Sequence, residues 1–157
     1  MKRTLVVANW KMNPSTLAEA KKLFRKVKKM GSQARVVHVV VCPPFVYIPE
    51  LRGSYTGNRI DFGAQDVFWE DRGAHTGEVS PLMLKSVGVT YVIVGHSERR
   101  EGGETNEMVH DKLVGVLRAG LTPLLCIGER ERDRHGAYLS FLKEELESAL
   151  KGITKEQ

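Results

Sequence analysis

The stretch that decides the fold is Tyr91–Arg100 (YVIVGHSERR), in which four apolar residues end abruptly in glycine, histidine and charged side chains. A similar change occurs in Leu5–Asn13 (LVVANWKMN), where an apolar run leads into Asn9 and Lys11. Each stretch has the pattern of a short buried strand followed by polar and ionisable groups. Parallel α/β sheets carry their catalytic groups at the carboxyl ends of the strands. The two stretches therefore predict an active site on a parallel sheet.

Strand-like and helix-like segments alternate along the whole chain. Strands are predicted at residues 5–8, 36–41, 60–65, 91–94 and 121–127, with helical periodicity at 17–30, 80–88, 105–120 and 138–150. Five βα units in register predict a parallel sheet with right-handed crossovers. Periodicity alone fits either an open doubly wound sheet or part of a barrel. No glycine-rich phosphate loop follows the first strand, which argues against a dinucleotide-binding fold.

The first and last helices are expected to bury one apolar face each. In the first, Thr16 and Glu19 have capping-box spacing at the start, and Gly31 is expected at the end. Its predicted inner face comprises Leu17, Ala20, Leu23, Phe24, Val27 and Met30. The predicted inner face of the last helix comprises Tyr138, Leu139, Leu142, Leu146, Ala149 and Leu150.

Composition indicates a single globular domain over residues 1–157, with 41% hydrophobic and 27% charged residues. No apolar run reaches the roughly 18 residues that span a membrane, and the N-terminus lacks the pattern of a signal peptide.

Cys42 and Cys126 end apolar runs and are expected to be buried, reduced thiols, which favours the cytoplasm. The net charge of +5 comes largely from lysines and arginines at 21–29. They fit a solvated helix face better than a nucleic-acid partner, and they would help to attract an anionic substrate.

Several motifs resemble those of triosephosphate isomerase, in that family's order and spacing. They are NWKMN at 9–13, CPP at 42–44, GAQ at 63–65, GAHTGE at 73–78, GHSERR at 95–100 and CIGE at 126–129. The resemblance covers essentially all 157 residues. It implies an incomplete TIM (β/α)8 barrel with about five of its eight βα units. It also implies interconversion of dihydroxyacetone phosphate and glyceraldehyde 3-phosphate, in glycolysis and gluconeogenesis, without a metal or organic cofactor.

Lys11 and His96 are the predicted catalytic residues. Asn9 and Lys11 are two apart in an extended segment, so their side chains point the same way, and the resemblance implies that both contact substrate. A lysine there can hold positive charge against a phosphate or an enediolate, although most lysines are simply surface residues. His96 is either a structural histidine or a neutral hydrogen-bond donor to a substrate carbonyl. A helical turn begun by Ser97 would favour the neutral form, and in this family the histidine is known to act so.

Five further residues are expected to support the site, of which Ser97 begins the helical turn after His96. Glu98 is either an exposed carboxylate at a helix start or the partner of Lys11, and the family resemblance implies the second. Arg99 and Glu129 are predicted to form an ion pair between neighbouring strand ends. Cys126 is expected to be a packing residue, because no histidine lies beside it in sequence. Asn9, Lys11, His96 and Glu129 should together line the inner face, with the helices outside.

The segment Phe68–Glu78 is long and contains Gly73 and Gly77, as functional surface loops often do. By resemblance it inserts into a twin subunit, where Thr76 reaches the partner's Asn9 and Lys11, so a homodimer is implied. The alternative is a mobile excursion of the chain.

The family's catalytic glutamate follows a sixth strand, and its phosphate loops follow the seventh and eighth. No segment of this chain matches them, so the chain alone is expected to be weakly active or inactive. The alternative function is a non-catalytic assembly module, or a truncated fragment that needs a complementing C-terminal partner. Two open sheet edges would favour association.

Overall fold

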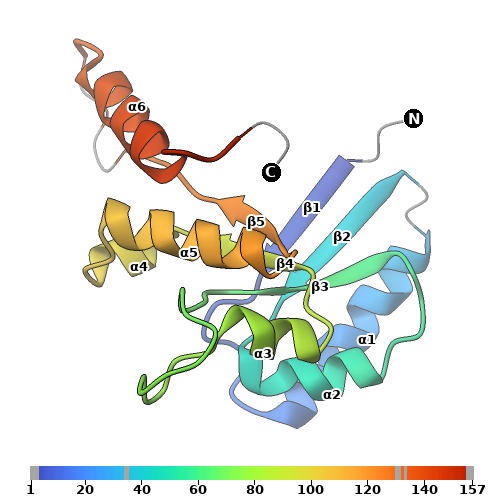
Figure 1. Cartoon of the computed structure of the whole chain (residues 1–157). Coiled ribbons are helices and arrows are strands. Elements are labelled where there is room, and N and C mark those ends of the chain that lie inside the picture. The colour runs from blue at the N-terminus through green and yellow to red at the C-terminus, as the bar shows by residue number, and fades with distance from the viewer. Residues whose placement is uncertain (1–3, 34–35, 130–131, 133, 155–157) are drawn as a thin grey trace.

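The computed structural model describes residues 4–33, 36–129, 132 and 134–154. Within them, five parallel strands follow one another in sequential order, each hydrogen-bonded to the next. The strands are β1 (Thr4–Asn9), β2 (Val37–Cys42), β3 (Ile60–Ala64), β4 (Tyr91–Val94) and β5 (Thr122–Leu125). The sheet curls into an incomplete barrel, as Figure 1 shows. The predicted fold is confirmed.

The helices are α1 (Leu17–Gln33), α2 (Ile48–Gly53), α3 (Pro81–Ser86), α4 (Ser97–Glu101), α5 (Asn106–Arg118) and α6 (Ala137–Ala149). A short 3-10 turn, η1 (Phe45–Tyr47), precedes α2. α3 and α5 begin at N-caps, where Ser80 Oγ accepts from Met83 N (3.2 Å) and Thr105 Oγ1 accepts from Met108 N (3.3 Å). No helix among the described residues combines the length and the apolar character needed to cross a bilayer.

Two apolar layers lie on opposite faces of the sheet, because successive side chains along each strand point to alternate faces. The larger layer packs the helices against one face of the sheet, with Phe24 of α1, Phe62 of β3 and Val109 of α5 almost fully buried. The smaller layer lies on the other face, where Val40, Cys42 and Ile93 pack together. Because successive strand side chains point to opposite faces, the second layer marks the inside of the curve.

The predicted helix boundaries hold except at Gly31, which was expected to end the first helix and instead lies inside α1. A Cβ at this position would come within 3.1 Å of Ile60 Cδ1, so the glycine permits close approach of the helix to β3. At the helix start the predicted cap is present. Glu19 N donates to Thr16 Oγ1 (3.3 Å), and that hydroxyl donates to Glu19 Oε2 (3.0 Å).

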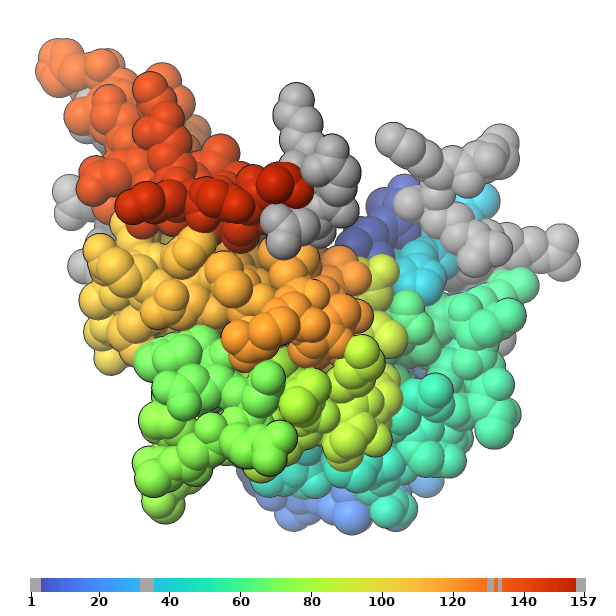
Figure 2. Space-filling view, in the orientation of Figure 1, coloured from blue at the N-terminus to red at the C-terminus, as the bar shows by residue number. Residues whose placement is uncertain are grey.

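Apolar side chains are exposed at both ends of the sheet. β1 is an edge strand, and Leu5, Val6 and Val7 are 43%, 45% and 39% exposed. The expected burial of whole helix faces is wrong at these ends, because no further βα unit lies beyond α1 or α6 in the described part of the chain. The exposed members of those faces are Leu17, Leu23 and Met30 in α1 and Leu139, Leu146 and Leu150 in α6. In the space-filling view α6 lies along one side of the molecule (Figure 2).

The two thiols are both free, but only Cys42 is fully buried. Cys126 is half-buried, so the expectation that both would be buried is wrong for this residue. Cys126 follows β5, the second edge strand, which pairs only with β4 among the described strands, so its other side is left open.

Candidate active site

The carboxyl ends of β1, β3 and β4 meet around a cavity of about 360 Å3. Asn9, Lys11, His96, Glu98 and Arg99 all line it, so the structure brings five of the predicted site residues together. The rest of the lining is Met12, Phe45, Gln65, Asp66, Val67, Gly77, Glu78 and Val79. The volume lies in the range of small-molecule sites.

Lys11 adopts a left-handed backbone conformation, with φ of 56°, which is unusual for a residue other than glycine. Its amide donates to Asn9 Oδ1 (2.9 Å), and its Nζ contacts Glu98 Oε1 (2.6 Å). The hydrogen bond from Lys11 holds the pKa of Glu98 below its usual range. Both side chains are about half exposed, so both predicted alternatives for Glu98 hold together: it is reached by solvent and paired with Lys11.

His96 is the N-cap of α4, and the helical turn expected after it is present. Its Nδ1 accepts a hydrogen bond from Glu98 N (3.2 Å). An amide donates only to an unprotonated ring nitrogen, so in this arrangement Nδ1 is the acceptor and Nε2 is the ring nitrogen that carries a proton. His96 lines the cavity and can donate from Nε2, as the predicted role requires.

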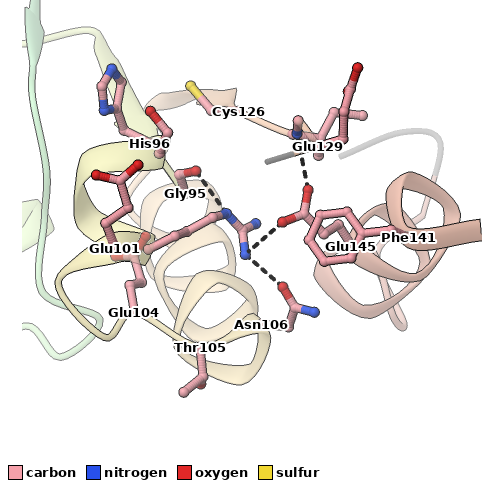
Figure 3. A pocket seen from close by; sticks show the side chains of 14 residues that line it. Gly95, His96, Glu101, Glu104, Thr105, Asn106, Cys126, Glu129, Phe141 and Glu145 are labelled. Carbon is pink, nitrogen blue, oxygen red and sulfur yellow. Dashed lines mark hydrogen bonds and ion pairs between the residues drawn. The ribbon is translucent and has the colours of Figure 1, made fainter. Parts of the chain in front are cut away.

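Ser97, Cys126 and Glu129 line a second, larger hollow of about 940 Å3, which also includes His96 (Figure 3). Glu129 therefore does not join Lys11 and Asn9. The predicted pair between Arg99 and Glu129 is wrong. Arg99 Nε contacts Asp66 Oδ2 (2.8 Å), whereas Glu129 Oε1 accepts from Arg132 Nε (2.8 Å). A hydrogen bond from the backbone amide of Glu129, followed by the one from Arg132, lowers the pKa of Glu129.

The ion pair that links the neighbouring strand ends uses Arg100 and Glu145, which sequence reasoning missed. Arg100 donates to Gly95 O (2.9 Å) and contacts Glu145 Oε1 (3.2 Å), and Glu145 Oε2 accepts from Gly128 N (3.0 Å). The dashed lines in Figure 3 trace this connection between the end of β4 and the segment after β5. Glu145 was hidden in sequence because it falls in a helix whose other charged residues face solvent.

The sequence analysis also missed a buried lysine, Lys112, which contacts the cavity-lining residue Asp66. Lys112 is 2% exposed and contacts both Glu104 and Asp66, the latter at 2.6 Å. Asp66 in turn contacts Arg99, so α4, α5 and the segment after β3 share one charge network. A buried charge is tolerated only when paired in this way. The network fixes α4, and with it His96 and Glu98, against the sheet.

Thr76 lies in the exposed stretch 72–78. This stretch belongs to the loop between β3 and α3, drawn in green in Figure 1. The segment is held by its own contacts rather than lying loose. The rings of Phe68 and Trp69 stack at 4.0 Å, and His75 Nε2 lies 3.1 Å from Glu70 Oε2. Arg118 also donates to Trp69 O (3.1 Å). The segment Phe68–Glu78 is therefore an ordered loop held by side-chain contacts, and its residues 72–78, including Thr76, are exposed.

Comparisons with known proteins agree with this geometry. The family model for triosephosphate isomerase matches residues 4–157. The triosephosphate isomerases of Thermoanaerobacter sp. (strain X514) and Dictyoglomus turgidum are 46% and 38% identical, over 98% and 100% of this chain. The crystal structure of the Bartonella henselae enzyme superposes with a TM-score of 0.84 at 30% identity, covering 97% of this chain and 63% of that one.

The chain spans about 62% of the length of the Thermoanaerobacter relative. The match nevertheless extends over almost all of the chain, and it includes the strand ends that carry Lys11 and His96. This chain belongs to the triosephosphate isomerase family.

Proposed function

We propose that this chain provides the electrostatic half of a triosephosphate isomerase site, which interconverts dihydroxyacetone phosphate and glyceraldehyde 3-phosphate. The observation that carries the proposal is the convergence of Lys11, Asn9 and His96 on one cavity of about 360 Å3. Lys11 supplies positive charge for the phosphate and for the developing enediolate. His96 donates from Nε2 to the substrate carbonyl oxygen. Both groups act where charge appears in the transition state.

The proton-abstracting base is proposed to come from the segment that the relatives contain beyond the matched region. Three carboxylates line the cavity here, and two of them form ion pairs. Asp66 contacts Arg99 and Lys112, and Glu98 contacts Lys11. The third, Glu78, is exposed to solvent. A carboxylate held by a cation is a poor base. Loss of a positioned general base costs about 10²–10⁴ in rate. The 157-residue chain alone should therefore show trace turnover at most.

The test is an isomerase assay of the chain with and without a fragment that carries the last three βα units of the Thermoanaerobacter relative. Addition should raise turnover by orders of magnitude. His96→Gln and Lys11→Met should each remove most of the gain, whereas Lys22→Met, on the exposed face of α1, should not. Robust turnover by the chain alone, abolished by Glu98→Gln or Glu78→Gln, would show that the base lies in this chain.

We further propose that the protein is a cytoplasmic glycolytic and gluconeogenic enzyme and forms a homodimer. Two free thiols suit a reducing compartment. Met12 and Phe45 line the cavity and are 93% and 53% exposed. They form an apolar surface at the edge of the cavity, which a second copy of the chain would bury. The accessible Thr76 is the part of that copy proposed to reach Asn9 and Lys11.

The second candidate function is a non-catalytic assembly module. It is favoured by the exposed apolar side chains at β1 and α6, which would pair with another chain whether or not catalysis followed. The same fragment experiment separates the two. Tight binding of the C-terminal fragment without isomerase activity supports the module, and recovered activity supports the enzyme.

A further inference from the structure

We propose that Gln65 is a positioning residue that fixes the backbone of Lys11 and so aims the lysine side chain into the cavity. The importance of this aim for catalysis rests on the proposed function, but the structural link does not. Gln65 follows β3 directly and lines the same cavity as Lys11.

The side-chain amide of Gln65 connects two backbone segments. Its Nε2 donates to Lys11 O (2.9 Å) and to Cys42 O (2.7 Å). Cys42 O also accepts from Trp10 N (3.0 Å), so the end of β2 holds the chain just before Lys11 as well. Gln65 therefore ties the loop after β1 to the ends of β2 and β3. Both Nε2 protons are used, which leaves this amide no freedom to flip.

Lys11 needs such support because its φ of 56° is disfavoured for a side chain with a Cβ. Asn9 Oδ1 fixes the amide side of the residue (2.9 Å), and Gln65 fixes the carbonyl side. The left-handed residue turns the chain so that Lys11 Nζ meets Glu98 Oε1 at 2.6 Å. That contact is half exposed, and exposed ion pairs are too weak to hold a disfavoured backbone by themselves.

The test uses the pKa of Glu98 as a reporter, followed by carbon NMR of its carboxyl in the full chain. Lys11 keeps this pKa low. Gln65→Met preserves the length of the side chain but removes both donors, so the pKa of Glu98 should rise toward its ordinary value. In a Lys11→Met background, Gln65→Met should cause no further rise.

Glu107 is the internal control. Its pKa is also lowered, but by its own backbone amide and Thr105 at the start of α5. General loosening of the fold would move both carboxyls, whereas loss of positioning moves Glu98 alone. An unchanged Glu98 titration in folded Gln65→Met overturns the proposal. If that variant does not fold, the unaltered chain decides: Gln65 side-chain amide protons should exchange slowly with solvent, and fast exchange overturns the proposal.

In the enzyme completed with the C-terminal fragment, Gln65→Met should lower kcat/KM tenfold to about 100-fold, because misplaced catalytic groups cost rates of that order. Failure of the fragment to restore any activity would count against the proposed function only. The Glu98 titration would still decide the role of Gln65.

Discussion

Cys42 and Cys126 lie in the same inner layer but differ in their access to solvent. Burial raises the pKa of the Cys42 thiol to about 12, and it raises that of Cys126 against the opposing charge of Arg100. The thiolate is the reactive form, so neither cysteine is primed as a nucleophile. This agrees with the prediction that Cys126 is a packing residue.

We expect a disulfide reagent at neutral pH to modify Cys126 slowly and Cys42 only when the chain unfolds. The variants Cys126→Ser and Cys42→Ser each leave one of these two thiols, so they show which modification rate belongs to which cysteine. In Cys126→Ser, the remaining thiol should react at the rate of unfolding, and added urea should accelerate both together. Reaction of Cys42 much faster than unfolding would contradict its burial.

The pair of Lys11 and Glu98 predicts a dependence of stability on pH. The pKa of Glu98 is lower in the folded chain than in the unfolded one, so its contribution is complete above the unfolded pKa and is lost as pH falls through the folded pKa. Glu98→Gln should therefore destabilise the chain at pH 7 and have a vanishing effect at strongly acidic pH. Urea unfolding at a series of pH values measures this difference, and an effect independent of pH would contradict the pairing.

Single residues also show where sequence reasoning reaches its limit. Lys11, Asn9 and His96 could be predicted because they follow apolar strands directly. The partners of Arg99 and Glu129 could not, because consecutive residues of the short helix α4 point in different directions. Arg99 contacts Asp66 and Arg100 turns toward Glu145, and only the packed structure decides which of the two arginines meets which acid.

At the scale of elements, Gly115 shows how α5 fixes the segment Phe68–Glu78. A Cβ at Gly115 would lie 2.8 Å from Trp69 O, and that backbone has no room to yield. Gly115→Ala should therefore cost about 1–3 kcal/mol through overpacking, despite the better helix propensity of alanine. Gly53, which ends α2, has nothing within 4 Å of the same position.

Gly53→Ala is the matched control and should be neutral or stabilise by about 0.5–1 kcal/mol. Urea unfolding of the two variants gives the comparison. Equal effects of both substitutions would mean that α5 and Trp69 are not in close contact.

Elements were largely predictable because strands and helices carry their periods in sequence. All five strands and the helices α1, α3, α5 and α6 lie where the patterns placed them. α2 and η1 were missed, since they are too short to show a period and, unlike the equally short α3, they do not begin at a side-chain N-cap. The predicted end of α1 at Gly31 was wrong, because a glycine that ends a helix and a glycine that permits close packing look alike in sequence.

At the scale of the whole molecule, the exposed apolar residues of β1 and α6 predict self-association at micromolar concentration. Val6→Lys places a charge on the edge strand, as natural proteins do to block pairing, and should shift the chain toward monomer. Val114→Lys adds the same charge to the exposed face of α5 and should not. Sedimentation velocity is the measurement, and a compact monomer of the unaltered chain would contradict the prediction.

The position of β1 at the edge of the sheet has a consequence for the active site itself. Among the described strands β1 pairs only with β2, so its amides are expected to exchange with solvent through local openings that leave β3 and β4 intact. Asn9 and Lys11 are carried by this strand and the turn after it, whereas His96 follows a strand with neighbours on both sides. An edge strand thus delivers the lysine, and a phosphate ligand that binds Lys11 should slow amide exchange in β1 more than in β5, the edge strand on the opposite side.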